Sequence, residues 1–287
     1  MRSRLVLFPV LILCLCWTAC SSTPPPPSGD KYFADAKTNL DTSDFEGAIR
    51  NLERSISAAG EQPELQPAEI VRVALLISMA ESDKKLADAL ETSRRQPIAA
   101  PRYGELTQRR TDRFALARAH LLNALEEVMK QRAKLGDKPI PLNLKFPDFG
   151  AAENPVFTRL LKGMEVSREE VARLDPEFTR NALAMNMAGM VGAKDDVNKG
   201  REIFEKGNVA IDPRVYLVHV TESFHKLSEI FGPKNLDDAK YMKVSLEVVR
   251  DNLDLAGKML AAKPDKELEA RIKKCREECD KQLKKLT

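Results

Sequence analysis

The chain has 287 residues, with 46 basic and 43 acidic side chains, and 43% of its residues are hydrophobic. Two of the three excess positive charges are Arg2 and Arg4, which precede the first acidic residue, so the rest of the chain is almost neutral. This argues against a protein that binds nucleic acid through charge, because such proteins need a basic surplus to neutralise phosphates. The hydrophobic share is typical of a globular protein, and 6% aromatic residues with 13 glycines favour helices over strands.

The first 20 residues are organised like an export signal. Arg2 and Arg4 are followed by an apolar run, residues 5–16, which is too short to span a bilayer. The segment 17–20 (WTAC) resembles a bacterial lipobox, in which the cysteine is diacylated and becomes the mature N-terminus. We therefore predict a signal peptide over residues 1–19 and lipidation at Cys20, with an ordinary cleaved signal as the alternative.

Residues 20–30 have the composition of a tether. Four consecutive prolines, 24–27, favour an extended polyproline conformation that rises about 3.1 Å per residue. Ser21 directly after the cysteine resembles the sorting signal of enterobacterial lipoproteins that are sent to the outer membrane. This resemblance implies a lipid-anchored protein of the bacterial outer membrane that faces the periplasm, held there by its acyl chains.

A helical hairpin is predicted after the tether. Tyr32, Ala36 and Leu40 lie four residues apart, and Asp44 is positioned to cap a second helix that ends before Gly60. The apolar face of this second helix consists of Phe45, Ala48, Ile49, Leu52 and Ile56.

The same residues carry a family resemblance. Segment 44–49 (DFEGAI), with Leu52 and Ile56, resembles the second helix of a tetratricopeptide repeat, and Ala36 falls where that repeat places a small residue. Just after a lipidated cysteine, residues 32–56 are similar to the opening repeat of bacterial repeat lipoproteins, including the barrel-assembly lipoprotein and type IV pilus pilotins. The resemblance implies a helical surface that binds protein partners.

Helical patterning continues to the C-terminus without a period of about 34 residues. We predict a long helix over 106–135, a short helix capped by Ser167 and Glu170, a new helix opening at Asp175-Pro176 and a helix over 197–210. The expected fold is all-α. Its antiparallel helical hairpins form either a tetratricopeptide-like α-solenoid or a stacked helical bundle. The expected regions are an N-terminal helical region (31–135), a Pro-rich strap (136–155) and a C-terminal helical region (156–287).

The strap interrupts the helical pattern with four prolines. A loop of about 20 residues inside a compact domain is often functional. Its large apolar residues are Leu142, Leu144, Phe146 and Phe149. They predict either a strap that lies over the helical core or a lip that binds a partner.

Arginines are concentrated between residues 94 and 118. Guanidinium groups suit carboxylates and phosphates, so this group is a candidate patch for an anionic partner. Its members are Arg94, Arg95, Arg102, Arg109, Arg110 and Arg113. The alternative is a charged surface balanced by acids from other helices.

Cys275 and Cys279 lie four apart in a predicted helix, about 6 Å between Cα atoms. A strained bridge within the helix, a bridge to a second copy and two free thiols all stay open. His219 lies among apolar residues and is predicted to be a buried neutral histidine. No motif for a metal or a cofactor is present, so we expect neither.

The sequence favours a non-enzymatic, lipid-anchored scaffold that binds a periplasmic or outer-membrane protein of an envelope assembly, secretion or pilus machine. One alternative is a helical small-molecule-binding lipoprotein, by general resemblance to the T-component of tripartite periplasmic transporters. A less favoured alternative is an enzyme of the cell wall, which would need a carboxyl group with a raised pKa in a cleft.

Overall fold

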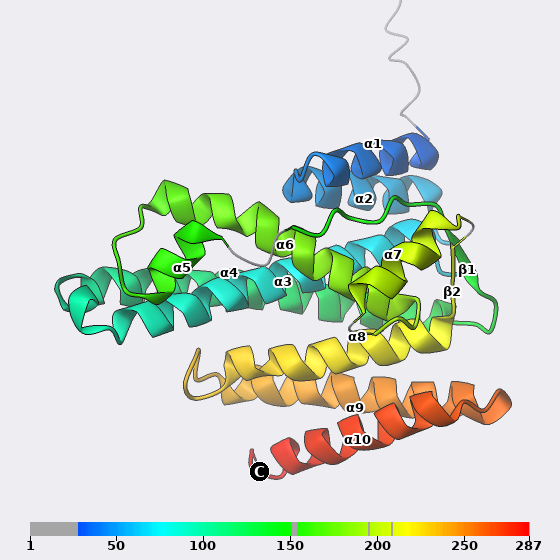
Figure 1. The fold of residues 1–287 in the computed structure, drawn as a ribbon. Coiled ribbons are helices and arrows are strands. Elements are labelled where there is room, and N and C mark those ends of the chain that lie inside the picture. The colour runs from blue at the N-terminus through cyan, green and yellow to red at the C-terminus, as the bar shows by residue number, and fades with distance from the viewer. Residues whose placement is uncertain (1–27, 151–153, 195, 208, 287) are drawn as a thin grey trace, which may run out of the picture.

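The structure of the protein is a computed structural model that describes residues 28–150, 154–194, 196–207 and 209–286 (Figure 1). Cys20 and most of the predicted tether lie outside these residues. The all-α fold class is confirmed, because helices account for 76% of the residues that the structure describes. The α-helices are α1 (Gly29–Asp41), α2 (Phe45–Ala59), α3 (Pro67–Arg94), α4 (Tyr103–Gln131), α5 (Pro155–Leu161), α6 (Arg168–Met190), α7 (Val197–Glu205), α8 (Pro213–Leu227), α9 (Ala239–Ala262) and α10 (Lys266–Leu283).

Short elements join these helices. Within the described residues, these are 3-10 turns at Pro97–Arg102, Arg132–Lys134 and Ser228–Phe231 and two strands, β1 (Ile140–Leu142) and β2 (Val209–Ile211). None of the helices in the described ranges is long and apolar enough to cross a membrane.

Local sequence explains where many helices begin. The Asp44 carboxylate accepts from the backbone N–H of Gly47 at 2.9 Å and caps α2, as expected from the sequence. Ser167 and Glu170 form the predicted capping box at the start of α6. Proline occupies the first helical position of α3, α5 and α8, where its missing N–H costs no intrahelical bond.

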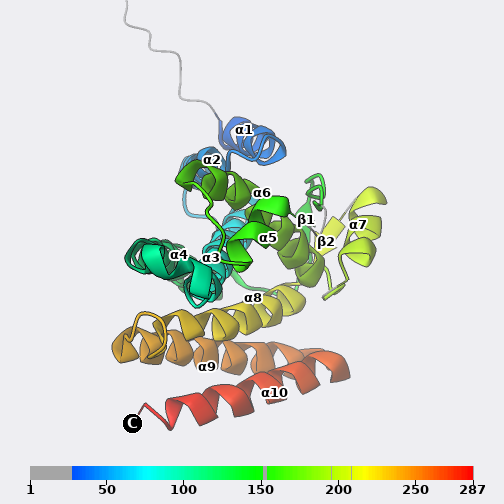
Figure 2. The same cartoon turned by 60° about the vertical axis from the view of Figure 1, so that its left-hand side comes forward.

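The helices are stacked in tiers (Figures 1 and 2). The α1–α2 hairpin forms one outer tier, the long α3–α4 hairpin lies with α6 in the middle, and α8, α9 and α10 form the opposite outer tier. One apolar core joins these tiers, with buried residues that extend from Ala36 in α1 to Cys279 in α10. A separate smaller core fills the space between the α3–α4 turn and α5 and α6, and includes Leu90, Leu106 and Phe178.

Two predicted boundaries are wrong. The helix expected to open at Asp175-Pro176 does not begin there, because α6 runs unbroken through Pro176. Tertiary contacts override the local preference of proline at this point, since Ser82 of α3 donates to the Asp175 carboxylate at 3.2 Å and Arg113 of α4 pairs with it.

The helix expected over 197–210 ends at Glu205, and Val209–Ile211 form a strand. In this strand Ile211 pairs with Ile140 and Val209 with Leu142, antiparallel. The two short strands tie the strap to the segment before α8. A sequence pattern did not show this pairing, because the partner strands lie far apart in the chain.

Candidate functional site

The strap residues divide between the core and the surface. Leu142 and Phe146 are buried and Leu144 is partly buried against the main core. The Phe146 ring lies 5.3 Å from that of Phe204 in α7, centre to centre. Phe149, in contrast, is 42% exposed. Three of the four candidates therefore hold the strap on the helical body, and Phe149 is the exposed one of the four.

Phe149 lines one end of an open groove along α3, which we call the α3 groove. It consists of two adjoining hollows of about 540 and 410 Å³, which share Glu81, Lys85 and Phe157. The larger hollow lies between α3, α5 and the end of α8, and its apolar lining is Ala89, Phe157, Leu161 and Leu227. The smaller hollow lies between α3, α6 and the end of the strap, and its apolar lining is Phe149, Phe157, Phe178, Ala182 and Met185.

Lys85 stands where the two hollows meet. Its ammonium lies 4.0 Å from the centre of the Phe178 ring and 5.4 Å from that of Phe157, which are cation–π distances. Partial burial lowers the pKa of Lys85, and Glu177 acts in the opposite direction. Among the described residues, neither Lys85 nor Lys226 of α8 has a carboxylate within ion-pair distance.

The acids of the groove are engaged with the protein itself. Lys84 pairs with Asp88 at 2.9 Å and lies 3.8 Å from Glu229. Asn154 donates to the Glu177 carboxylate at 2.7 Å. The linings of the two hollows therefore carry four acids and three lysines. The charge of Lys226 acts on Glu81, and that of Glu177 acts on Lys85.

Glu81 forms the wall that both hollows share, and a polar network supports it from behind. Buried Asn186 of α6 donates to the Glu81 carboxylate at 2.9 Å and to Ser78 Oγ at 3.1 Å, and its carbonyl oxygen lies 3.0 Å from Nε2 of His219. Burial raises the pKa of Glu81 to about 7, opposed by the Asn186 hydrogen bond and the charge of Lys226. His219 is partly buried and packs over Gly189, where any Cβ would lie 2.1 Å from the ring.

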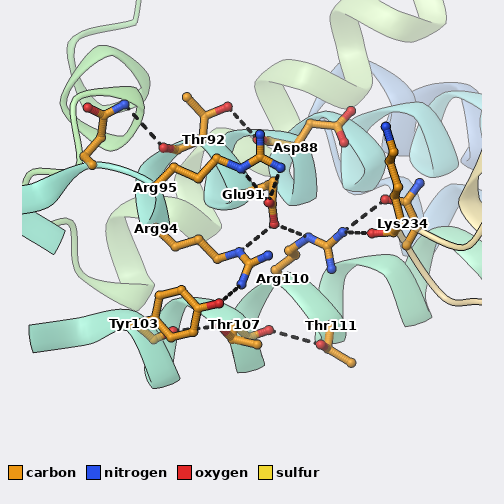
Figure 3. Close-up of polar contacts among 12 residues, drawn as sticks. Asp88, Glu91, Thr92, Arg94, Arg95, Tyr103, Thr107, Arg110, Thr111 and Lys234 are labelled. Carbon is orange, nitrogen blue, oxygen red and sulfur yellow. Dashed lines mark hydrogen bonds and ion pairs between the residues drawn. The ribbon is translucent and has the colours of Figure 1, made fainter. Parts of the chain in front are cut away.

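Three of the six candidate arginines meet at one carboxylate (Figure 3). Glu91 pairs with Arg94 at 2.6 Å, with Arg95 at 2.7 Å and with Arg110 at 2.9 Å. These contacts lower the pKa of Glu91, and the hydrogen bond from Arg94 contributes most. Arg94 also donates to the Tyr103 hydroxyl, and Arg110 donates to the backbone carbonyl of Lys234.

The other three arginines have separate partners. Arg102 donates to the backbone carbonyl of Gly163 at 2.5 Å, and buried Arg109 to that of Val166 at 3.1 Å. Arg113 pairs with Asp175 and, at 2.8 Å, with Asp83. The structure thus does not gather the six residues into one surface. Only Arg95, with 74% of its side chain exposed, presents most of its length to solvent.

Cys275 and Cys279 are free thiols in the structure, and both are buried. A bridge between them within the helix is not formed in this chain, which agrees with the strain expected for two cysteines on one helix face. A bridge to a second copy stays a prediction. Cys279 donates instead to the backbone carbonyl of Leu246 at 3.3 Å. Burial raises the pKa of the Cys275 thiol to about 12 and that of Cys279 to about 11, so neither is a reactive thiolate at neutral pH.

Sequence reasoning did not single out Lys85, Lys226, Glu81 or Asn186. Each lies in an ordinary helical pattern, and α3, α6 and α8 bring them together only in the folded chain. No cluster of potential metal ligands occurs within the described ranges. Comparison of the chain with family models, curated proteins and solved structures gives no match.

Proposed function

We propose that the protein is a lipid-anchored scaffold of the outer membrane that faces the periplasm and binds a protein partner of an envelope machine without catalysing a reaction. The observation that supports this most directly is the α3 groove. It is open and elongated, its lining is both apolar and charged, and it is built on long helices that pack into the core. Such a surface suits a partner segment.

The position of the groove fits a tethered binding protein. Ser55 of α2 donates to the carbonyl of Gly29 at 2.8 Å, and Arg72 near the start of α3 pairs with Glu53 of α2 at 2.7 Å. The chain therefore enters α1 beside the first turns of α3. Lys85 lies 18 residues beyond Pro67, so about 27 Å of helix separates the groove from that end. A lipid at Cys20 would raise the effective concentration of the groove for a partner near the membrane.

The finer architecture is part of the same proposal. The α1 and α2 helices, with 13 and 15 residues, support a tetratricopeptide-like unit at the N-terminal side. The α3 and α4 helices have 28 and 29 residues, which exceeds the helices of that repeat. We propose that the chain from α3 onward is a stacked bundle whose outer surface carries the binding site.

Two measurements test the proposed function. Cys20→Ala should move the protein from the membrane to the soluble fraction, and unchanged partition would contradict the anchor. A photo-crosslinking amino acid at Phe149 should capture a protein of the envelope in living cells, whereas the same group at Val244, exposed on α9, should not. Equal capture at both positions would contradict a scaffold that acts through the groove.

The volume of the hollows also favours a second candidate, the small-molecule-binding lipoprotein. Each lies within the range of about 300–1,000 Å³ that is usual for ligand pockets. Native mass spectrometry of the protein released gently from membranes separates the two candidates. A bound small molecule that is lost in Lys85→Glu would favour this alternative over the scaffold.

The raised pKa of Glu81 is the feature that the cell-wall enzyme alternative requires. We place this alternative third, because the Glu81 carboxylate is already held by Asn186. Cleavage of purified cell-wall polymer that is lost in Glu81→Gln would raise it above the other two.

A further inference from the structure

Helix α10 is the outermost helix of its tier. It packs on α9 and α8, and its other side faces away from the rest of the described chain (Figures 1 and 2). Residues 263–265 (Lys-Pro-Asp) join it to α9, which ends at Ala262. Rotation of the chain at these residues would lift α10 away without breaking a contact between any other two helices. Peripheral elements of this kind open more readily than the core.

The face of α10 that packs on its neighbours changes in character along the helix. Apart from Arg271, its buried residues are Leu268, Ile272, Cys275 and Cys279, spaced four, three and four residues apart. The first two are aliphatic and the next two are thiols, and Leu283 adds a partly buried contact beyond them. The buried stripe in the C-terminal half of α10 therefore consists of two cysteines, so a chemical change at these thiols acts directly on the packing.

Polar contacts complete the seam between α10 and its neighbours. Arg271 donates twice to the Glu222 carboxylate of α8, at 2.8 and 3.1 Å, and Arg276 pairs with Asp254 of α9 at 2.7 Å. Both side chains of the second pair are exposed, and such pairs contribute little net stability. The docked position of α10 therefore depends on its short buried stripe and on Arg271.

The docked helix protects both thiols. Both are buried, and Cys279 Sγ donates to the backbone carbonyl of Leu246 in α9 at 3.3 Å. Burial raises the pKa of both thiols, so they become reactive only when α10 opens. On one helix face, Cβ atoms four residues apart are separated by about 5–6 Å, beyond the roughly 3.5–4.5 Å of a disulfide. A bridge between Cys275 and Cys279 therefore unwinds a turn of α10, and the bridged helix no longer fits the face that it occupies.

We propose that α10 is a redox latch, which lies on α8 and α9 while Cys275 and Cys279 are reduced and is held away from them by a disulfide between these two residues. The oxidant is a disulfide of the glutathione class. Once α10 opens, the Cys279 thiolate attacks one sulfur of this disulfide and expels one glutathione thiolate. The Cys275 thiolate then attacks the Cys279 sulfur of the mixed disulfide and expels the second. The two cysteines lose two electrons and two protons, and one glutathione disulfide becomes two glutathione thiols.

The test uses the full mature protein in lipid nanodiscs, first reduced and then incubated with glutathione disulfide. Intact mass and peptide mapping follow formation of the bridge, and hydrogen exchange reads the amides of α10 and α3. In the bridged protein, the amides of α10 should exchange at least tenfold faster and those of α3 less than twofold faster, and dithiothreitol should restore the starting rates. The double variant Cys275→Ala/Cys279→Ala should exchange the amides of α10 at the same rate with and without the oxidant.

Two variants that remove one positive charge each test whether opening precedes oxidation. Arg271→Met removes the contacts to Glu222 and should speed formation of the bridge at least fivefold. Lys273→Met removes the same charge from an exposed position of α10 and should change the rate less than twofold. Thermal unfolding identifies a variant that fails to fold. Arg276→Met, which removes the pair with Asp254, then replaces Arg271→Met and should speed formation of the bridge at least threefold.

Four results would overturn the latch. They are no bridge within the chain even in excess glutathione disulfide, a bridge between two copies in its place, a bridged protein in which α10 keeps its slow exchange, and equal rates of bridge formation in Arg271→Met and Lys273→Met. These readouts involve neither Cys20 nor the α3 groove, so their outcome is independent of the proposed function.

Discussion

The arginine end of α3 and the groove along the same helix use positive charge in opposite ways. At the arginine end, Arg94, Arg95 and Arg110 pair with Glu91 (Figure 3). Arg94 also donates to the Tyr103 hydroxyl, and Arg110 donates to a backbone carbonyl. In the groove, Lys85 and Lys226 have no ion pair among the residues described. The dense cluster in the sequence holds α3 to α4, whereas Lys85 packs over the Phe178 ring and faces the solvent-open groove.

This difference shows why local density of a residue type is a poor guide to a binding surface. An arginine has five donors, and a helical protein offers many carbonyls and carboxylates to receive them. Three of the six arginines therefore share Glu91, and the other three have partners elsewhere in the fold. A lysine is available for recognition only where the fold places no acid next to it, and that depends on residues from other helices.

Replacing Arg113 should have the largest effect on the arginine side of this comparison. Arg113 joins α4 to Asp83 in α3 and to Asp175 in α6, and the side chain of Asp83 is 5% exposed. Arg113→Met leaves these acids without that cation, so we expect a loss of about 2–3 kcal/mol in the free energy of unfolding, measured by urea denaturation. Arg95→Met, at the exposed member of the cluster, should cost at most about 0.5 kcal/mol. Equal losses would contradict the division between structural and exposed arginines.

A substitution in the polar network behind the groove should have the next largest effect on the free energy of unfolding. Gly189→Ala places a Cβ 2.1 Å from the His219 ring, and we expect overpacking to cost about 2 kcal/mol. Gly257→Ala in α9 meets no atom within 4 Å and should stabilise the protein by about 0.5–1 kcal/mol. Chemical denaturation of both variants tests the pair. A harmless Gly189→Ala would show that His219 does not hold its position over α6.

The pH dependence of the free energy of unfolding should distinguish Glu81 in the groove from Glu91 at the arginine end. The pKa of Glu81 is raised from 4.5 to about 7, so the folded state binds its proton more tightly. Its contribution to stability is complete below pH 4.5 and is lost as the pH rises towards 7. Glu81→Gln should therefore be about 1–2 kcal/mol more stable than the wild type at pH 8 and nearly equal at pH 4.5. Denaturation curves at both pH values measure this, and a difference independent of pH would contradict it.

Glu91 should show the opposite sign with a smaller magnitude. Its pKa is lowered by the arginines, so its contribution is present above its ordinary pKa of 4.5 and is lost as the pH falls through the lower folded value. Glu91→Gln leaves the three arginines to repel one another, so it should lower the free energy of unfolding by about 0.5–1 kcal/mol at pH 7. The loss should be smaller in high salt, which screens that repulsion. Stability measured at low and high salt tests this. A salt-independent loss would show that packing, and not charge, is responsible.

The sequence predicted the local features of the fold well. The all-α class, the Asp44 cap and the capping box at Ser167 depend on neighbouring residues and were readable from spacing alone. The passage of α6 through Pro176 and the pairing of Val209–Ile211 with the strap were not readable. In both cases a contact with a distant segment overrides the preference of the local residues.

The candidate site shows the same division. By itself, the sequence determined the helical class, many of the helix ends and the chemical types available, because these depend on side chains within a few residues of one another. The tertiary structure decided which charges have partners, that Phe149 is the exposed one of the four apolar candidates in the strap, and that Glu81, Lys85 and Lys226 line one hollow. These outcomes depend on which helices pack together, and packing joins residues that are more than a hundred positions apart in the chain, as with Asn186 and Ser78 at 108.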